Sequence, residues 1–450
     1  MLKSEALIYV PSDTPEAMVL ATRAVAGVPP IIRAVMTLKK SGLSAVTLLA
    51  EKSQKRKIER FLGRFKGDQL PKVSIICYDD PYRVSPVTLA EIVDSLDQRF
   101  FVINSNLLFD EHMSKRLANL PVHGHEFLSY KEGIHFLPFI DTTQQAFNTL
   151  TRYVEEAPRS IENCLHMLHT SLKAKVVQNT SSNVSFLMQR LRDRAVAEKF
   201  LAENIRHSTT GPVAKHLNKR ISLPISLLLS KLWISPHAIT AFNIIIGLLS
   251  GVFIADGHHY WTILVGATLY QAASVIDGCD GEVAKLTFRA SRFGEFIDTI
   301  SDNLSLVSLL VGIVGGYWRH SHSMSTFWIG GLLIGSFALT LGLMIRVMKK
   351  RSESASLVAF DKDYLQHLPQ SYGKWLIKLI HTGKYLLKKD LVSLTVFLFA
   401  LVGKAYWWFF AATLVAVSGA LVLSYLAFKD TLAPRFSQAP AREKAASFSK

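Results

Sequence analysis

Apolar runs long enough to cross a membrane dominate the second half of the chain. Residues 238–255 and 261–276 contain no charged side chain, and a helix of about 20 apolar residues spans a bilayer. Further apolar runs predict spans near 293–318, 324–345, 390–403 and 405–428. We therefore predict six transmembrane helices within residues 238–430, followed by a polar tail at 431–450.

The first 150 residues instead alternate short β-rich runs with helical patterns. Predicted strands cover residues 6–10, 45–49, 73–77 and 100–103. Predicted helices cover residues 30–40, 54–65 and 87–96. Alternation of this kind is typical of a mostly parallel sheet covered by helices on both faces. Residues 1–152 are therefore expected to form a cytosolic α/β domain.

Two segments connect this domain to the predicted spans. Residues 153–207 have mixed charge and apolar runs too short to cross a membrane, so we predict a helical connector. In residues 208–237, basic side chains alternate with apolar ones, and Trp233 stands near the end. This pattern predicts a juxtamembrane amphipathic helix that lies among the lipid headgroups.

Charge and cysteine content narrow the class of protein. The 51 Lys and Arg residues outnumber the 35 Asp and Glu residues, which gives a net charge of +16. Such an excess suits nucleic acid or an anionic membrane face, and the apolar runs favour membrane lipids over nucleic acid. The three cysteines lack metal-binding spacing and indicate a reducing compartment. The N-terminus lacks a signal-peptide apolar region of adequate length, so the first domain is expected to stay cytosolic.

Basic residues are distributed unequally between the predicted loops. The connections on one side carry only Arg319 and Lys404, whereas the other side carries Lys285, Arg289 and Arg292 and a basic loop. The positive-inside rule then places both termini in the cytosol. The membrane that holds the protein is expected to be the inner or plasma membrane if the organism is prokaryotic. We assign the basic loop at 349–389 to this charge bias; contact of its lysines with an acidic substrate is the alternative.

Four aspartates stand where two of the predicted membrane helices meet. Asp277 and Asp280 are three apart, and Asp298 and Asp302 are four apart, so each pair shares a helix face. Like charges near hydrocarbon are costly and need cations. Hard oxygen ligands favour Mg²⁺, Mn²⁺ or Ca²⁺ over zinc. The sequence therefore predicts a divalent metal site, with four carboxylates facing the cytosol.

The spacing resembles the signature of the CDP-alcohol phosphotransferases, D-x2-D-G-x2-A-R-x8-G-x3-D-x3-D. Its positions here are Asp277, Asp280, Gly281, Ala284, Lys285, Gly294, Asp298 and Asp302. Every spacing matches, and the only departure is Lys285 where the family usually has arginine. Lysine keeps the positive charge but lacks the bidentate fork. Pro236, His237 and Thr240 also resemble the family's Pro-Asn-x-x-Thr, with histidine in place of asparagine.

The resemblance implies a reaction in which an alcohol attacks the β-phosphorus of a CDP-linked substrate and CMP leaves. The four aspartates would hold two Mg²⁺ or Mn²⁺ ions, and Asp302 would also act as general base. The expected contacts with the CDP moiety are Gly281, Ala284, Lys285, Gly294 and Thr240. We also expect a homodimer.

The first domain resembles the nucleotidyltransferase fold of sugar-phosphate cytidylyltransferases. That family has a glycine-rich loop after its first strand, but no glycine lies between Tyr9 and Arg23 here. Ser105 and Asn106 stand where the family has its metal-binding Gly-Asp. A loop without glycine exposes few amides to phosphate. We therefore expect an inactive, scaffold-like domain; a working cytidylyltransferase is the alternative.

The residues leave the donor and the acceptor open. The first expectation is an integral-membrane enzyme of the EC 2.7.8 type that uses CDP-diacylglycerol as its donor and an alcohol or polyol phosphate as its acceptor. The alternative is a CDP-inositol-like donor condensed with a polyol phosphate, as in fused inositol-phosphate cytidylyltransferase/di-inositol-phosphate phosphate synthases. A non-catalytic membrane scaffold is a further alternative, which the intact set of four aspartates disfavours.

Overall fold

The computed structural model describes residues 5–11, 14–65, 67–78, 92, 96, 98–120, 127–132, 135–147, 174–178, 185–209, 212–351 and 388–432. The chain divides into two compact units. The α/β unit comprises Met1–Thr209, Leu223–Ile234 and Glu282–Arg289. The membrane unit comprises Thr210–Ser222, Ser235–Gly281 and Ala290–Lys450.

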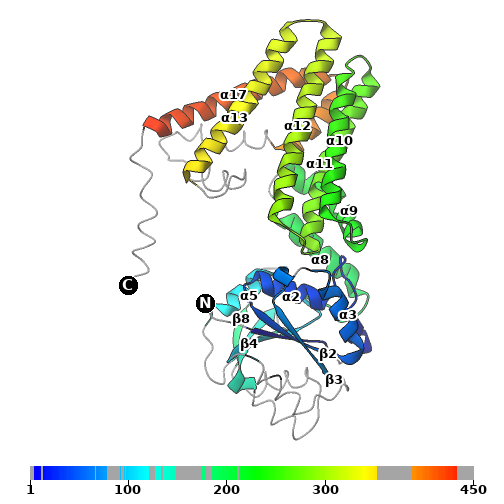
Figure 1. Cartoon of the computed structure of the whole chain (residues 1–450), viewed down its shortest axis with the longest axis vertical. Helices are drawn as coiled ribbons and strands as arrows, with labels where there is room; N and C mark the ends of the chain where they lie inside the picture. Colours follow the sequence, from blue (N-terminus) through cyan, green and yellow to red (C-terminus); the bar gives the residue numbers. More distant parts are fainter. Residues whose placement is uncertain are drawn as a thin grey trace. The chain divides into compact units, whose positions relative to one another are not determined.

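A seven-stranded sheet with the order β3-β2-β1-β4-β7-β6-β8 forms the centre of the α/β unit (Figure 1). Its strands are β1 (Glu5–Tyr9), β2 (Ala45–Glu51), β3 (Lys72–Tyr78), β4 (Arg99–Asn104), β6 (Phe127–Glu132), β7 (His135–Thr143) and β8 (Ala174–Gln178). Strands β1 to β4 pair in parallel, β7 is antiparallel to β4 and β6, and β8 is parallel to β6. The four predicted strands and the mostly parallel sheet are confirmed.

The helices of this unit include α1 (Pro15–Leu20), α2 (Pro30–Lys40), α3 (Lys52–Leu62), α5 (Glu111–Ala118) and α8 (Asp193–His207). Helix α2 has the predicted bounds, because Pro30 suits its first turn and two lysines suit its last turn. Its apolar side chains are buried with those of β1 and β2 in one hydrophobic core. The helix predicted at 87–96 lies outside the described residues, apart from Ile92 and Leu96.

The helical connector predicted at 153–207 is wrong at two described segments. Ala174–Gln178 is strand β8 of the main sheet, and β9 (Ser185–Leu187) pairs with β5 (Leu107–Phe109) in a second, two-stranded sheet. Each segment is a strand because it pairs with a partner far away in sequence, which a local helical pattern does not reveal. Helix α8 at Asp193–His207 agrees with the prediction.

Helices lie at all six predicted spans: α10 (Pro236–Ala255), α11 (Tyr260–Leu286), α12 (Arg292–Ser321), α13 (Ser325–Arg351), α16 (Lys389–Leu401) and α17 (Ala405–Leu432). Among the described residues, α10, α11, α12 and α17 are long and apolar enough to cross a membrane. The apolar described part of α13 is shorter, and α16 has 13 residues. Six spans therefore stay a prediction.

Within the predicted juxtamembrane segment lie a π-helical turn (Ala214–Asn218) and α9 (Lys219–Lys231), and its place at the membrane surface stays a prediction. Apolar side chains on α9, Leu228 among them, are exposed. A helix with exposed apolar residues and flanking lysines suits a position among lipid headgroups.

Small residues bring α10 and α12 into backbone contact. Gly247 and Gly251 lie four apart on α10, and Ser305, Ser308 and Gly312 face them from α12. A Cβ atom on Gly251 would lie 2.6 Å from the Ser308 carbonyl carbon, and one on Gly312 would lie 2.9 Å from the Gly251 Cα. Close approach through small residues is a common way for membrane helices to associate. This contact places the aspartate-bearing α12 against α10.

Replacing Gly251 by valine should therefore force α10 and α12 apart and destabilise the membrane unit. Overpacking of this kind costs about 1–3 kcal/mol, measurable as a lower melting temperature in detergent. The matched control is Gly331→Val on α13, where an added Cβ meets no atom within 4 Å. Equal melting temperatures for the two variants would contradict the packing argument.

Candidate active site

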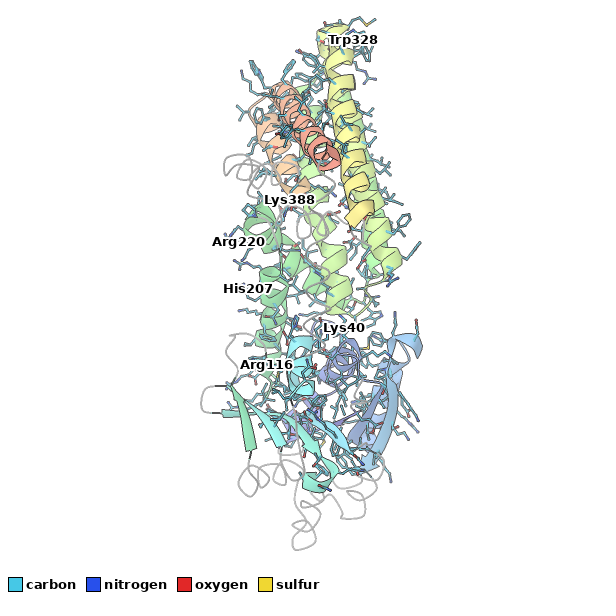
Figure 2. The ribbon with its side chains drawn as sticks, turned by 90° about the vertical axis from the view of Figure 1, so that its left-hand side faces the viewer. Lys40, Arg116, His207, Arg220, Trp328 and Lys388 are labelled. Carbon is cyan, nitrogen blue, oxygen red and sulfur yellow. The ribbon has the colours of Figure 1, made fainter. Side chains whose placement is uncertain are left out.

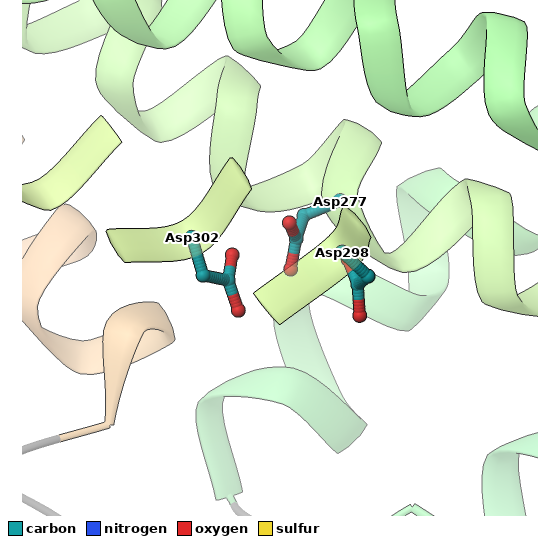
Figure 3. A group of neighbouring side chains, drawn as sticks. All are labelled: Asp277, Asp298 and Asp302. Carbon is teal, nitrogen blue, oxygen red and sulfur yellow. The ribbon is translucent and has the colours of Figure 1, made fainter. Parts of the chain in front are cut away.

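Three of the four predicted aspartates gather between α11 and α12. Asp277 on α11 and Asp298 and Asp302 on α12 each offer a carboxylate oxygen, and these oxygens all lie within 4.8 Å of one another. Figure 3 shows the three side chains coming from two neighbouring helices, with Asp277 and Asp302 turned toward each other. All three are half-buried. The helical spacing of the aspartates thus brings carboxylates from both pairs together.

Asp280, the fourth aspartate, is buried and held by bonds outside this group of three. Its Oδ2 accepts a hydrogen bond from the Thr240 hydroxyl on α10 at 2.5 Å, and its Oδ1 accepts one from the Gly281 amide at 2.6 Å. Thr240 is only 3% exposed. In this structure Thr240 therefore contacts a predicted metal ligand, and its proposed contact with the nucleotide stays a prediction.

Lys389, at the start of α16, supplies positive charge to the carboxylates. Its ammonium nitrogen lies 2.8 Å from Asp277 Oδ1 and also forms an ion pair with Asp302. Asn243 on α10 donates a hydrogen bond to Asp277 Oδ1 at 3.0 Å. Sequence reasoning missed both residues. The available signals were an amide within an apolar span, since polar groups in membrane helices are often functional, and a lysine at the end of the basic loop.

The oxygen donors fit a hard divalent cation. Three carboxylates at this separation repel one another, and the ammonium of Lys389 shows that the group accepts a cation. Asp298 Oδ1 is buried and has no hydrogen-bond partner among the described residues, and a buried polar atom without a partner is costly. Asp277, Asp298 and Asp302 would hold such an ion, with Asp280 beside Asp277 on the same helix.

A polar network fixes the turn that carries Lys389. Asp390 Oδ1 accepts hydrogen bonds from Asn218 Nδ2 at 2.7 Å and from the Ser274 hydroxyl at 3.3 Å. Ser274 lies one helical turn before Asp277 on α11. Because Asp390 is tied to α11 in this way, the first turn of α16 presents the neighbouring Lys389 to the carboxylates.

The two predicted site glycines differ in their surroundings. A Cβ atom on Gly281 would meet no atom within 4 Å, so open space adjoins the backbone beside Asp280. A Cβ on Gly294 would lie 3.2 Å from Ser291 Oγ and 3.3 Å from His237 Cε1. Gly281 therefore leaves room for a ligand, whereas Gly294 lies against the helix cap of α12 and the His237 ring.

The remaining predicted contacts, Ala284 and Lys285, lie on the last turn of α11. This turn belongs to the α/β unit. Ala284 is buried, and Lys285 is exposed.

In the α/β unit, a side chain just beyond the carboxyl end of β4 forms a hydrogen bond to another part of the same unit. Asn106 is 1% exposed, and its Nδ2 donates a hydrogen bond to the Ala17 carbonyl at 2.7 Å. Ala17 belongs to α1, a helix capped by the Thr14 hydroxyl. This helix follows β1, where the cytidylyltransferase resemblance would place a glycine-rich loop. The Asn106 amide thus holds α1 against β4.

Replacing Lys389 by methionine should remove the internal cation and expose the repulsion among the carboxylates. Breaking a fully buried ion pair costs about 3–5 kcal/mol; we expect roughly 1–3 kcal/mol without metal, because the Asp302 side chain is 40% exposed. Mn²⁺ affinity should rise by about tenfold or more: a unit charge about 4 Å away is worth about 4 kcal/mol at an effective dielectric of 20, or nearly a thousandfold, and solvent screening at the 40% exposed Asp302 reduces it.

Melting temperature in chelator and Mn²⁺ titration by electron paramagnetic resonance would check both effects. Lys404→Met, which removes an exposed lysine, is the matched control. A Lys389→Met protein with unchanged melting temperature and unchanged Mn²⁺ affinity would show that the ammonium does not balance the cluster.

Comparisons with known proteins converge on the segment that contains the aspartates. Residues 233–376 match the family model described as CDP-alcohol phosphatidyltransferase. Archaetidylinositol phosphate synthase of Methanothermobacter thermautotrophicus is 33% identical over 111 residues, 25% of this chain and 51% of that protein. A bifunctional IPC transferase and DIPP synthase of Archaeoglobus fulgidus is 26% identical over 133 residues, 30% of this chain and 26% of that protein. The chain thus spans about half and about a quarter of the lengths of these relatives.

Among solved structures, the inositol-1-phosphate CTP transferase from T. maritima matches 46% of this chain and 97% of its own, with 11% identity and a TM-score of 0.36. The family match includes all four aspartates and both glycines of the signature. The resemblance predicted from their spacing is confirmed. Over residues 233–376, the chain is similar to the CDP-alcohol phosphatidyltransferase family.

Proposed function

We propose that this protein is a metal-dependent membrane CDP-alcohol phosphotransferase that joins a CDP-polyol donor of the CDP-inositol type to a polyol phosphate and releases CMP. One observation carries the proposal: Asp277, Asp298 and Asp302 meet within 4.8 Å inside the segment that matches the family. Four helices long and apolar enough to cross a membrane, together with this family match, support the proposal that the chain is a membrane protein.

The names of the relatives support polyol chemistry over the CDP-diacylglycerol donor that we expected first. One is an archaetidylinositol phosphate synthase, and another combines IPC transferase with DIPP synthase. Two further relatives with the second name are 34% and 30% identical over 92 and 107 residues. CDP-diacylglycerol is kept as the alternative donor, and the experiment below separates the two.

In the proposed reaction, the acceptor hydroxyl oxygen forms a bond to the β-phosphorus of the donor. The bond from that phosphorus to the oxygen bridging to CMP breaks, and CMP leaves with the bonding electrons. The hydroxyl proton passes to the Asp302 carboxylate, whose side chain is more exposed than that of Asp277. Exposure suits a base that must reach a substrate.

Asp277, Asp280 and Asp298 would hold Mg²⁺ or Mn²⁺ together with Asp302. Such ions neutralise a diphosphate and stabilise a departing phosphate. Lys285 would pair with the diphosphate as a point charge. The space beside Gly281 would accept part of the nucleotide. We also propose cytosolic termini, an active site that faces the cytosol, and a homodimer.

A donor and acceptor panel tests this proposal on the purified full chain in lipid nanodiscs. With Mg²⁺, CDP-inositol plus inositol phosphate should release CMP, measured by chromatography, and excess chelator should abolish the release. CDP-diacylglycerol should be inactive under the same conditions. CMP release from CDP-diacylglycerol alone would transfer the proposal to the lipid donor, and no release from either donor would support a scaffold.

Replacing Asp302 by asparagine separates the base from the ligands. A general base contributes about 10²–10⁴-fold to turnover, so Asp302→Asn should lower kcat by that factor and largely preserve donor binding. Asp277→Asn and Asp298→Asn should weaken Mn²⁺ and donor binding together. Asp256→Asn, at the exposed end of α10, is the control. Near-normal turnover in Asp302→Asn would exclude it as the base.

We further propose that the α/β unit has no cytidylyltransferase activity. The supporting contact is the bond from Asn106 Nδ2 to the Ala17 carbonyl, which commits that amide to the fold. Incubated with CTP, Mg²⁺ and inositol phosphate, the full chain should release no pyrophosphate above a no-enzyme blank. Formation of CDP-inositol in that assay would overturn the proposal.

A further inference from the structure

Two bulky residues, each in a loop between helices, adopt the left-handed backbone conformation that glycine adopts more readily. Trp233, between α9 and α10, has φ 58°, and Phe288, between α11 and α12, also has φ 58°. Such conformations are outliers for large residues and persist only where the surroundings hold them. Both rings pack against the hydrophobic core of the α/β sheet. The two loops are therefore held by tertiary contacts.

The Phe288 ring covers two cations of α2. The Arg33 guanidinium carbon lies 5.3 Å from the ring centroid, and the Lys40 ammonium lies 4.8 Å from it. Arg33 is buried, donates a hydrogen bond to the Val25 carbonyl at 2.9 Å, and has its pKa lowered to about 10 by that burial. Aromatic faces attract cations, most strongly where water is excluded. Phe288 thus fits a site built by the first domain.

Lys40 is labelled in Figure 2 and lies at the end of α2. Burial lowers the pKa of Lys40; Glu111 opposes this shift, and the charges of Arg33 and Lys285 add to it. The signature lysine, Lys285, is therefore close enough for its charge to act on the first domain.

Two guanidinium groups lie over the Trp233 ring. Those of Arg64 and Arg289 are 4.9 Å and 4.7 Å from its ring, and the Phe65 ring meets it edge to face at 6.3 Å. Arg289 Nη2 also donates a hydrogen bond to the Ile234 carbonyl at 2.6 Å. Arg289 follows Phe288 directly, so this bond ties the α11–α12 loop to the α9–α10 loop.

Contacts on α9 fasten the same region. Lys231 Nζ lies 2.7 Å from Glu198 Oε2 on α8. Gly27, at φ +81°, lies so close to α9 that a Cβ there would be 2.9 Å from the Ser230 carbonyl carbon. The first domain thus contacts this region through an ion pair, backbone atoms and two aromatic rings.

We propose that the Met1–Thr209 part of the α/β unit acts as a positioning device for phosphotransfer. It holds the segment Glu282–Arg289, which is the end of α11 and the loop after it, through Phe288 and Trp233, and so sets the geometry of the chain between the two aspartate pairs. This role rests on the proposed function. Phe288 and Trp233 are positioning residues, which act through Lys285 and the loop. In this proposal, a domain that has no cytidylyltransferase activity still contributes to catalysis by the membrane unit.

Phe288→Ala in the full chain tests the device, with Phe288→Tyr as the conservative variant. We expect faster hydrogen exchange across residues 282–289, and a kcat/KM for the CDP donor lowered about 10- to 100-fold, the scale of a misplacement near 1 Å. Phe288→Tyr should keep both the exchange rate and kcat/KM near the values of the unaltered chain. Trp261→Ala, an exposed aromatic at the other end of α11, is the matched control and should leave both unchanged.

A charge exchange at the α8–α9 contact provides a second test if Phe288→Ala fails to fold. Glu198→Lys and Lys231→Glu should each lower donor kcat/KM, and the double variant should recover it. Wild-type exchange in residues 282–289 and wild-type kcat/KM in Phe288→Ala and both single variants would overturn the device. An inactive wild type would instead refute the proposed function, while the exchange measurement on 282–289 would still decide whether the domain holds the loop.

Discussion

Repulsion among carboxylates is the constraint on which the membrane unit depends. Three carboxylate oxygens within 4.8 Å at the junction of two apolar helices are unstable without positive charge nearby. Lys389 supplies that charge and is held in place through Asp390, while the Asn243 amide donates to Asp277. In the proposed reaction a substrate diphosphate would add negative charge to the same place, so a divalent cation would become more necessary as the substrate arrives. Stability and the proposed phosphotransfer would then impose the same requirement on this site.

Much of the fold and of the site could be predicted because the signals are local. Helix α2 has its predicted bounds because proline and two lysines mark its ends, and the aspartates share helix faces because their spacing is three and four. Lys389 and Asn243 could not be predicted, because each meets Asp277 from another helix, and Lys389 is 112 residues away. Strand β8 was missed for the same reason, because its pairing with β6 depends on residues outside its own five.

The carboxyl end of β4 in the α/β unit contributes to the fold through Asn106. Asn106 stands at the carboxyl end of a central parallel strand, where ligands of such sheets bind, but its side chain bonds to α1. The core beneath, from β1, β2 and α2, is intact and provides the surface against which Trp233 and Phe288 pack. The packing of the two rings requires burial and cationic partners, and it requires neither glycine nor a metal-binding aspartate.

The energetics of the α11–α12 loop explain why its conformation could not be predicted from its own residues. A left-handed conformation costs an ordinary residue about 1–2 kcal/mol, so Phe288 would not adopt it in isolation. Cation–π contacts contribute about 0.5–2 kcal/mol each, and Phe288 has two such partners, Arg33 and Lys40, more than 240 positions earlier in the chain. The loop's conformation is thus a property of the α/β unit as a whole. Its basic residues could be recognised from the sequence, but the contacts that hold it could not.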